Sequence, residues 1–470
     1  MAERKEGLKM AIQYVNYDVV VIGGGSAGIS AAVSAAKNGA KTLLVESGSM
    51  VGSDLLAGLP IDGCLSSRGE WIVKGFAQEL FDECKKMGGY IGDFSDRRAL
   101  YMVAVDPEIM NVAIIELLSR YGVETLLYTF AETVVMDGEE VKGVMAVNKS
   151  GKIMISAKVF IDCTGDGDIA VAAGADYEIG SKTGELQPVS MVFRMAGVDT
   201  ERLLRFIVEH PENVGLAENP IINKTKEECA RELYELGLPK VFFEGSGPML
   251  SEAIARGDIY PCSMLAIIPV SMDRKEVAIN STRLSGVNAI YPKQLSDSLF
   301  DLTEQVKICA AFLKKCVPGF EHAVFSGLAP KIGVRETRRI MGEYVLSEED
   351  ILEGRKSEMG IGKGGHELDI HGAAKNHERK QIKDAGSYDI PYGCIIPKGI
   401  ANMFIAGRCI SSSRGAHSSA RVMGTCMATG QAAGTAAALS VKNEKAIRNI
   451  SIDALREILR EQGAVLEGTK

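Results

Sequence analysis

The sequence lacks several patterns that mark common classes of protein. Its ten cysteines are scattered, and no two of them are spaced Cys-x-x-Cys. An iron–sulfur ligand run, a zinc ribbon or a thioredoxin-like dithiol is therefore not expected, and we predict no metal site. Positive charge is not in excess either, because 53 Lys and Arg stand against 61 Asp and Glu, a net charge of −8. This balance argues against a nucleic-acid-binding protein, which would carry a basic stripe.

Signals for export or membrane insertion are also missing. Residues 1–18 carry charges throughout and contain no apolar core of the kind that a secretory signal needs. The most apolar helical stretch, 424–441, contains threonines, Gln431 and many alanines, and its Gly430 and Gly434 have GxxxG spacing. We interpret it as a buried helix packed closely on a sheet rather than as a membrane span. We therefore expect a cytoplasmic protein with free, mostly buried thiols and no membrane partner.

Glycine, by contrast, is abundant: 51 of the 470 residues are glycine and only 14 are proline. Many backbone positions must therefore need a positive φ or a close approach, as they do where the backbone itself touches a bound cofactor. With 24% charged and 46% hydrophobic residues, the composition is that of a folded globular protein. The length allows roughly two to four domains.

The N-terminal segment YDVVVIGGGSAGISAAVSAAKNGAKTLLVES predicts a β–α–β unit. A β-branched run enters a glycine turn, an alanine-rich helix follows, and a second apolar run ends at Glu46. In this unit Gly23 would allow the tight turn, Gly25 would let the backbone reach a pyrophosphate, and Gly28 would allow close helix–strand packing. Glu46 would accept hydrogen bonds from a ribose, and a glutamate in place of an arginine disfavours a ribose 2′-phosphate. A dinucleotide site is the prediction.

Further along the chain, helices are predicted at 70–86 and 107–121, and an antiparallel meander at 125–161. Strands such as VSMVFRM and EVAINST then alternate with helices at 200–209, 226–236 and 294–315. The C-terminal segment returns to strand, glycine turn and small-residue helix, so we expect it to rejoin the first domain. A second GxGxxG match, 360–365, has no strand before it, and we interpret it as a flexible loop.

Nearly the whole chain resembles the FAD-dependent oxidoreductases of the glutathione-reductase-like flavoprotein superfamily, which is also called the two-dinucleotide-binding-domain superfamily. The resemblance is carried by VVVIGGGSAGISAA with Glu46, FIDCTGDGDIAVAAGADYEIG, VPGFEHAVFSGLAPKIGVRETRRIMGEYVLSEEDIL, DIHG and IPYGCIIPKGIANMFIAGRCISSSRGAHSSARVMGTCMATGQAAGTAAAL. It implies an α/β fold, with an FAD-binding Rossmann domain that carries the β-meander and a mixed α+β substrate domain. The expected boundaries are 1–185 and 390–470 for the FAD-binding domain and 186–389 for the substrate domain.

The resemblance implies FAD as the cofactor, bound extended, with its ADP half on the first β–α–β unit and its isoalloxazine at the domain interface. After the strand VFIDC, small residues would let the backbone pass close to the cofactor, although an Asp-Gly turn without a ligand is the alternative. The residues expected to contact FAD are Gly23, Gly25, Ser26, Ala27, Gly28, Glu46, Ser47, Val134, Thr164, Gly165, Asp166, Gly407, Arg408, Gly424 and Thr425.

The candidate catalytic residues are those that the family pattern places near the flavin ring: His371 in DIHG, His417 and Arg421 in GAHSSAR, and Arg335 in GVRETRR. If GVRETRR is a strand, Arg335, Thr337 and Arg339 share one face, which could bind a carboxylate, while Glu336 and Arg338 share the other. The alternatives are a satisfied structural role for each histidine and ion pairs between the arginines and nearby carboxylates. Cys64 is interpreted as a buried apolar residue rather than as a catalytic thiol.

The resulting hypothesis is hydride transfer between the flavin N5 and a small organic substrate, with an anionic one favoured by the arginines, and with a separate electron donor or acceptor. The alternatives are an electron-transfer subunit of a larger redox complex, a non-redox flavoprotein such as an isomerase or lyase, and a monooxygenase. Self-association is left open by the sequence.

Overall fold

The computed structural model describes residues 12–372 and 377–469, so most of the N-terminal segment in which no secretory signal is expected, residues 1–11, lies outside the described residues. Its largest sheet has the order β6-β2-β1-β9-β8-β7, and β21 pairs with β9 as well. The parallel part consists of β1 (Ile12–Ile22), β2 (Thr42–Val45), β6 (Glu124–Leu126), β9 (Gly151–Asp162) and β21 (Met403–Ile405). An α/β fold with a Rossmann-like parallel sheet is therefore present, as expected.

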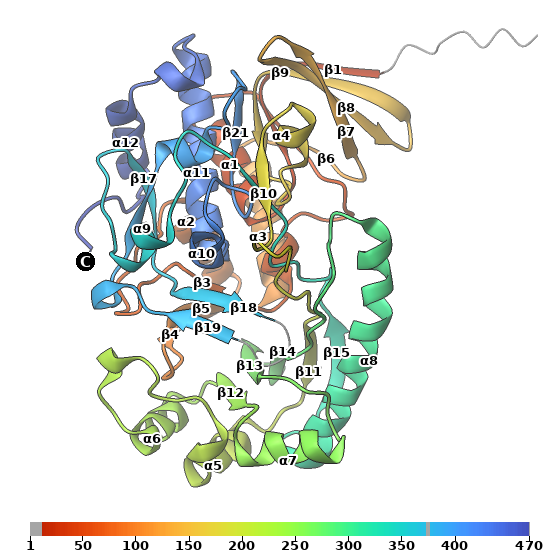
Figure 1. Ribbon diagram of the computed structural model, residues 1–470, viewed down its shortest axis with the longest axis vertical. Coiled ribbons are helices and arrows are strands. Elements are labelled where there is room, and N and C mark those ends of the chain that lie inside the picture. The colour runs from red at the N-terminus through yellow and green to blue at the C-terminus, as the bar shows by residue number, and fades with distance from the viewer. Residues whose placement is uncertain (1–11, 373–376, 470) are drawn as a thin grey trace, which may run out of the picture.

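The antiparallel meander is also confirmed. It consists of β7 (Phe130–Asp137), β8 (Glu140–Asn148) and the first part of β9. The Asp-Gly and Ser-Gly turns expected from the sequence join these strands, because Asp137 pairs with Glu140 and Asn148 pairs with Gly151. The meander projects from the upper end of the parallel sheet (Figure 1).

The C-terminal segment rejoins the first domain, as predicted. Its helix α11 (Met423–Lys442) lies beside α1 (Ser26–Lys37), the helix of the β–α–β unit (Figure 1). A Cβ atom added at Gly430 would lie 2.2 Å from the Ala27 carbonyl oxygen, and one at Gly434 would lie 2.1 Å from that of Ala31. The GxxxG glycines thus pack on α1, because only a residue without a side chain lets the two backbones approach so closely. The helix α11 also contacts β1, β9 and β21 of the parallel sheet, as expected. No helix in the described part of the chain is long and apolar enough to cross a membrane.

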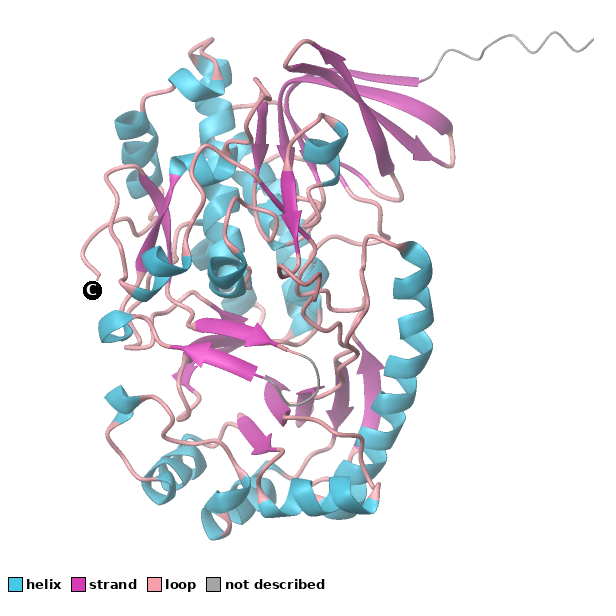
Figure 2. Ribbon diagram, viewed as in Figure 1, coloured by secondary structure: helices cyan, strands magenta, loops and turns pink. Residues whose placement is uncertain are grey.

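A second sheet, with its own core, occupies the lower half of the molecule in Figure 2. Its order is β12 (Val241–Glu244), β13 (Met264–Ser271), β14 (Glu276–Asn280), β11 (Phe193–Ala196) and β15 (Val324–Leu328). The helices of this half are α5 (Thr200–Glu209), α6 (Lys226–Leu236), α7 (Pro248–Arg256) and α8 (Pro292–Cys316).

A small sheet formed by β3 (Ile61–Asp62), β5 (Tyr101–Val105) and β4 (Tyr90–Ser95) lies between these two halves. The other elements are α2 (Phe76–Lys86), α3 (Pro107–Arg120), α4 (Asp168–Ala172), β10 (Tyr177–Ile179), β16 (Arg338–Ile340), α9 (Glu348–Leu352), β17 (Gly360–Gly364), β18 (Leu368–His371), β19 (His377–Lys380), β20 (Tyr388–Pro391), α10 (Arg414–Ala420) and α12 (Ile452–Glu461).

The hydrophobic cores divide the chain differently from the boundary expected at residue 389. The buried residues of the second core run from Val189 to Ala329, with Ala57 added. Leu346, Ile361 and Tyr388 belong instead to the core that contains α1 and α11. The stretch 346–390 is therefore packed with the nucleotide-binding half.

Two local predictions are wrong. The glycine-rich segment 360–365 is not a flexible loop, because β17 pairs with β20 and is buried. A Cβ atom at Gly364 would lie 2.2 Å from the Tyr388 ring, so this glycine serves close packing rather than flexibility. The helix expected at 70–86 begins only at Phe76, since Gly75 has φ +64°, a left-handed conformation that cannot continue a helix.

Candidate functional site

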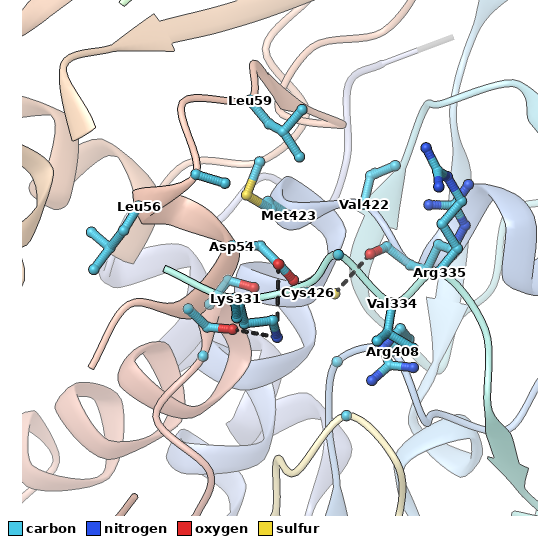
Figure 3. A pocket seen from close by; sticks show the side chains of 18 of the residues that line it. Asp54, Leu56, Leu59, Lys331, Val334, Arg335, Arg408, Val422, Met423 and Cys426 are labelled. Atoms are coloured by element: carbon cyan, nitrogen blue, oxygen red, sulfur yellow. Dashed lines mark hydrogen bonds and ion pairs between the residues drawn. The ribbon is translucent and has the colours of Figure 1, made fainter. Parts of the chain in front are cut away.

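A cavity of about 700 Å³ lies between the parallel sheet and the second sheet. At one end it is lined by the glycine turn of the β–α–β unit and by Glu46, and at the other by Asp62, Lys240 and Phe242. Figure 3 shows part of this cavity, with Val334, Arg335, Val422 and Met423 among the labelled side chains that line it. A cavity of this size and shape is typical of a ligand site.

The three motif glycines have different surroundings. A Cβ atom at Gly28 would lie 1.7 Å from the Gly23 carbonyl oxygen, and one at Gly23 would lie 2.4 Å from the Cys163 carbonyl oxygen. These two glycines therefore serve packing of the turn against α1 and β9. A Cβ atom at Gly25 would meet nothing nearer than Ser53, at 3.5 Å, because Gly25 faces the cavity.

The entrance to α1 offers backbone donors to the cavity. The helix begins at Ser26 with Gly25 as its N-cap, and no side chain caps it. Ser26 and Ala27 line the cavity there, at the positive end of the helix dipole, where anions are stabilised. Glu46 lies next to this end and is held in place because Gly24 N and Gly48 N each donate to its carboxylate at 2.6 Å. Since a carboxylate has about four acceptor positions, the Glu46 carboxylate can still accept from a ligand.

The loop after β9 contributes a second wall. Asp162 is fully buried and accepts hydrogen bonds from Thr164 N and from the first amides of α4, which fixes the loop. Arg408 Nη2 donates to Asp166 Oδ1 at 2.7 Å, and Thr337 Oγ1 donates to the same atom at 2.6 Å. Burial acts to raise the pKa of Asp166, but the Arg408 charge and these hydrogen bonds outweigh it, so that the pKa lies below its usual value. Gly165, Asp166 and Arg408 all line the cavity.

The segment 333–339 is not the strand that we expected. Only Arg338 and Arg339 belong to β16, which pairs with β10, and the residues before them run irregularly along the cavity. Glu336 and Arg339, placed on opposite faces by the strand pattern, form an ion pair of 2.9 Å between buried side chains. The alternation fails because the chain bends here to bring Glu336 inward, where its carboxylate also accepts from Gln187 N at 3.0 Å.

Arg335 nevertheless reaches the cavity. Its Nη1 donates to the Pro188 carbonyl and to Ser190 Oγ, each at 2.8 Å, and among the described residues no carboxylate lies within ion-pair distance of it. Burial, together with the positive charges of Arg421 and Arg283, lowers the pKa of Arg335 to about 9. Because burial and two neighbouring positive charges disfavour the charged form of Arg335, an anion bound beside it would be stabilised.

Arg421 and His371 lie at the same part of the cavity. The Arg421 guanidinium is 3.8 Å from the Asp369 carboxylate. His371, the last residue of β18, has its Nε2 2.9 Å from Asp369 Oδ2 and its Nδ1 2.8 Å from Arg283 Nη2. Because a guanidinium can only donate, Nδ1 is the acceptor and Nε2 carries the proton, so this arrangement holds a neutral imidazole with one defined tautomer.

Other predicted residues lie outside the cavity lining. His417 is 1% exposed, and neither ring nitrogen has a hydrogen-bond partner among the described residues. Burial and the surrounding arginines, Arg421 first, hold its pKa well below the usual value, so it is a neutral, enclosed histidine. Cys64 is fully buried, and burial raises the pKa of its thiol. Three more predicted cofactor contacts, besides Gly28, are also not part of the lining: Val134, Gly424 and Thr425.

Val134 lies in the middle of β7 and packs on the sheet, whereas the residues at the start of that strand, Phe130 and Ala131, line the cavity. Gly424 packs against the backbone of Gly63, where a Cβ atom would lie 2.5 Å from the carbonyl carbon. Gly424 and Thr425 are both buried in the first turn of α11. The residues just before them, Val422 and Met423, line the cavity instead. In both segments, the residues that line the cavity thus lie a few positions earlier in the sequence than the residues that we expected.

The sequence patterns did not predict the far end of the cavity. Asp62, Asp96 and Lys240 line it, as do Glu367 and Arg379. The available signal was a charged residue inside an apolar run, namely Lys240 in LPKVFF and Asp62 in LPIDGC. Such residues are rarely buried without a reason.

The chain is similar to several known proteins. The family described as FAD dependent oxidoreductase matches residues 18–459. The digeranylgeranylglycerophospholipid reductase of Picrophilus torridus is 29% identical over 198 residues, which are 40% of this chain and 48% of that relative, so the match spans about half of its length. Among solved structures, a geranylgeranyl bacteriochlorophyll reductase-like protein from Thermoplasma acidophilum is 13% identical over 97% of this chain and 85% of that one, with a TM-score of 0.49. The p-nitrophenol 4-monooxygenase of Pseudomonas putida is 12% identical over 96% and 85%, also with a TM-score of 0.49.

Proposed function

Because this chain belongs to the FAD dependent oxidoreductase family, we propose that it is an enzyme that transfers a hydride between the flavin N5 and a small organic anion. The observation that carries the proposal is that one cavity joins the glycine turn to a chamber that has Arg335 and Arg421 in its wall. The cofactor and the general class of enzyme follow from the family, and the substrate and the residue roles are the proposed part.

The residues present fit FAD. The Gly25 position leaves space where a phosphate would lie, the uncapped start of α1 supplies amide donors, and Glu46 supplies an acceptor for a ribose. Asp166 and Arg408, on the second wall, would bind the middle of the cofactor. When bound, FAD accepts or donates a hydride at its ring. The role of the chain is to hold it, to orient a substrate and to keep water out.

Arg335 and Arg421 are proposed to bind the anionic group of the substrate. Both line the middle of the cavity, and both have a pKa lowered first by burial, so a bound carboxylate would relieve the excess of positive charge. His371, held by Asp369, is proposed to orient the substrate through a hydrogen bond. A neutral imidazole at this position could exchange one proton with it.

A small polar substrate is favoured over a long lipid. The curated relative is named for a geranylgeranyl lipid. Here the chamber beyond Arg335 is lined by Asp62, Asp96, Lys240 and Glu367 as well as by apolar residues. An isoprenoid chain could not make hydrogen bonds with these charged groups and would leave them desolvated.

The test is the absorbance spectrum of the purified protein, followed by anaerobic photoreduction and a screen of hydroxy acids and enoates. The proposal expects a yellow protein with stoichiometric FAD, and a member of the screen that bleaches the oxidised flavin or reoxidises the reduced one. Turnover without any change in the oxidation state of the flavin would contradict the proposal and indicate an isomerase or lyase instead. Flavin that exchanges electrons only with a partner protein would indicate an electron-transfer subunit, and oxygen consumption coupled to substrate loss a monooxygenase.

A further inference from the structure

Two lysines are almost completely buried, each with 2% exposure, and they differ in how their charge is balanced. Lys363 lies in β17, and its Nζ is 2.6 Å from Asp389 Oδ1 in the paired strand β20. Lys240 precedes β12 and lines the far chamber of the cavity. Among the described residues, no carboxylate lies within 4.0 Å of the Lys240 ammonium, which is the limit for an ion pair. The charge of Lys240 is therefore not balanced by a paired carboxylate, as that of Lys363 is.

The surroundings of Lys240 leave its ammonium directed at the chamber. Its Nζ lies 4.1 Å from the centre of the Phe242 ring, a cation–π contact on one side. Asp96 lies nearby, but its Oδ1 already accepts three backbone hydrogen bonds, from Arg98, Ala99 and Leu100. The nearby Arg98 guanidinium is paired with Glu218.

Asp62, across the chamber, is the other incompletely satisfied group. Its Oδ1 is buried and has no hydrogen-bond partner among the described residues. The charged groups that influence Asp62 are Lys240 and three carboxylates, those of Asp96, Asp369 and Glu367. A carboxylate with one buried oxygen and a buried ammonium thus line the same cavity without forming an ion pair with each other, and so lack the pairing that a structural role requires.

We propose that Lys240 and Asp62 form the polar end of the substrate chamber, where they contact an oxygen atom of the substrate and exchange its proton. The proposal rests on the proposed function and adds the substrate class: a small organic anion whose reacting carbon carries a hydroxyl or carbonyl oxygen. Arg335 and Arg421 would bind the anionic group, and the two new residues would bind the oxygen at the reacting carbon.

The proposed transfers of a proton and a hydride balance. For a substrate alcohol, the O–H bond breaks and its proton moves to the Lys240 amine or the Asp62 carboxylate, while the C–O bond becomes a carbonyl. The bound flavin would supply the two-electron acceptor for the hydride of the C–H bond, so that no further oxidant is needed. In the opposite direction the pair returns the proton to the carbonyl oxygen.

The protonation equilibria of the pair suit this exchange. Burial lowers the pKa of Lys240, and the nearby carboxylates, Asp62 first, only partly oppose it. Burial likewise raises the pKa of Asp62, with Lys240 opposing it. The two pKa values therefore converge toward neutrality, where a group can both accept and release a proton during turnover.

The experiment labels lysine amines of the purified holoenzyme with formaldehyde and a borane reductant over a series of pH values, and quantifies each lysine peptide by mass spectrometry. Only neutral amines react. Lys240 is expected to label with a midpoint near pH 8, Lys363 to stay protected in the same sample, and the exposed Lys182 to calibrate the reagent. Saturating glycolate, which carries a hydroxyl for Lys240 as well as a carboxylate for the two arginines, should slow the labelling of Lys240 and leave that of Lys182 unchanged.

The Asp62→Asn variant gives the decisive comparison. Removing the carboxylate removes a charge that raises the pKa of Lys240, so the labelling midpoint should fall by about one pH unit. An unchanged midpoint, or a Lys240 that stays unlabelled while Lys182 reacts, overturns the assignment. The FAD content of each sample separates the two proposals: protein that lacks FAD contradicts the proposed function, whereas FAD-loaded protein with an unreactive or Asp62-independent Lys240 contradicts only this inference.

Discussion

The two ends of the cavity are built on different principles. At the nucleotide end, small residues and backbone amides make the surface, and the charged groups are already held, Glu46 by two amides and Asp166 by Arg408. At the substrate end, the buried Lys240 has no close carboxylate partner, and the buried Oδ1 atom of Asp62 accepts no hydrogen bond among the described residues. The first arrangement can bind a ligand through its shape and through backbone hydrogen bonds. The second can take part in a chemical reaction of the ligand. Substitutions should therefore affect binding at one end and turnover at the other.

The largest effect is expected within the glycine motif itself. Gly28→Val places a side chain into the Gly23 carbonyl, and it should destabilise the fold by more than about 4 kcal/mol or prevent folding. Gly25→Val faces the cavity, so the variant should fold but lose FAD, with a melting temperature close to that of the flavin-free unaltered protein. Thermal melts and the flavin-to-protein ratio measure both. A folded Gly25→Val protein that retains stoichiometric FAD would mean that the phosphate lies elsewhere.

The second comparison concerns the two buried lysines. Lys363→Met leaves Asp389 buried and unpaired, which should lower the free energy of unfolding by about 3–5 kcal/mol. Lys240→Met removes a buried charge without a close partner and should change it by less than about 1 kcal/mol, while abolishing turnover. Urea unfolding measures the difference. The double variant Lys363→Met/Asp389→Leu should recover most of the loss, and equal effects of the two single lysine variants would remove the distinction drawn between them.

A smaller effect is expected for anion binding in the middle of the cavity. Arg335→Met removes a charged donor, so the affinity for acetate, followed by the difference spectrum of the bound flavin, should fall about tenfold. Arg414→Met is the matched control, since Arg414 pairs with Glu336 and does not line the cavity. If both variants bind acetate as the unaltered protein does, Arg335 is not the anion site.

The smallest effect is expected for Lys331, which crosses the cavity to Ser53 and Asp54 (Figure 3). Both charged side chains of this pair are about 40% exposed, at 41% and 38%. Lys331→Ala should therefore change the free energy of unfolding by less than about 0.5 kcal/mol, because exposed ion pairs contribute little. A melting temperature several degrees lower would show that this contact contributes more to stability than its exposure implies.

The features that sequence predicted well depend on local patterns. The β–α–β unit, the meander with its two turns and the return of the C-terminal helix each have a signature of consecutive residues. The three motif glycines illustrate this, since the tight turn and the close packing at Gly23 and Gly28 follow from their spacing alone.

The features that it missed depend on contacts between distant segments. Segment 333–339 has the alternation of a strand, but burial of the Glu336–Arg339 pair overrides it. The glycines of 360–364 suggested a loop because the Tyr388 ring that they pack against comes later in the chain. Likewise, Asp62 and Lys240 meet at one chamber although they are far apart in sequence, and no spacing rule could join them.

The most direct test of the two-ended cavity is isothermal titration of the flavin-free protein with FAD and with FMN, which lacks the adenosine half. If the glycine turn and Glu46 hold that half, FAD should bind at least about a hundredfold more tightly than FMN, and Gly25→Val should erase most of the difference. Equal affinities for the two flavins in the unaltered protein would contradict the account.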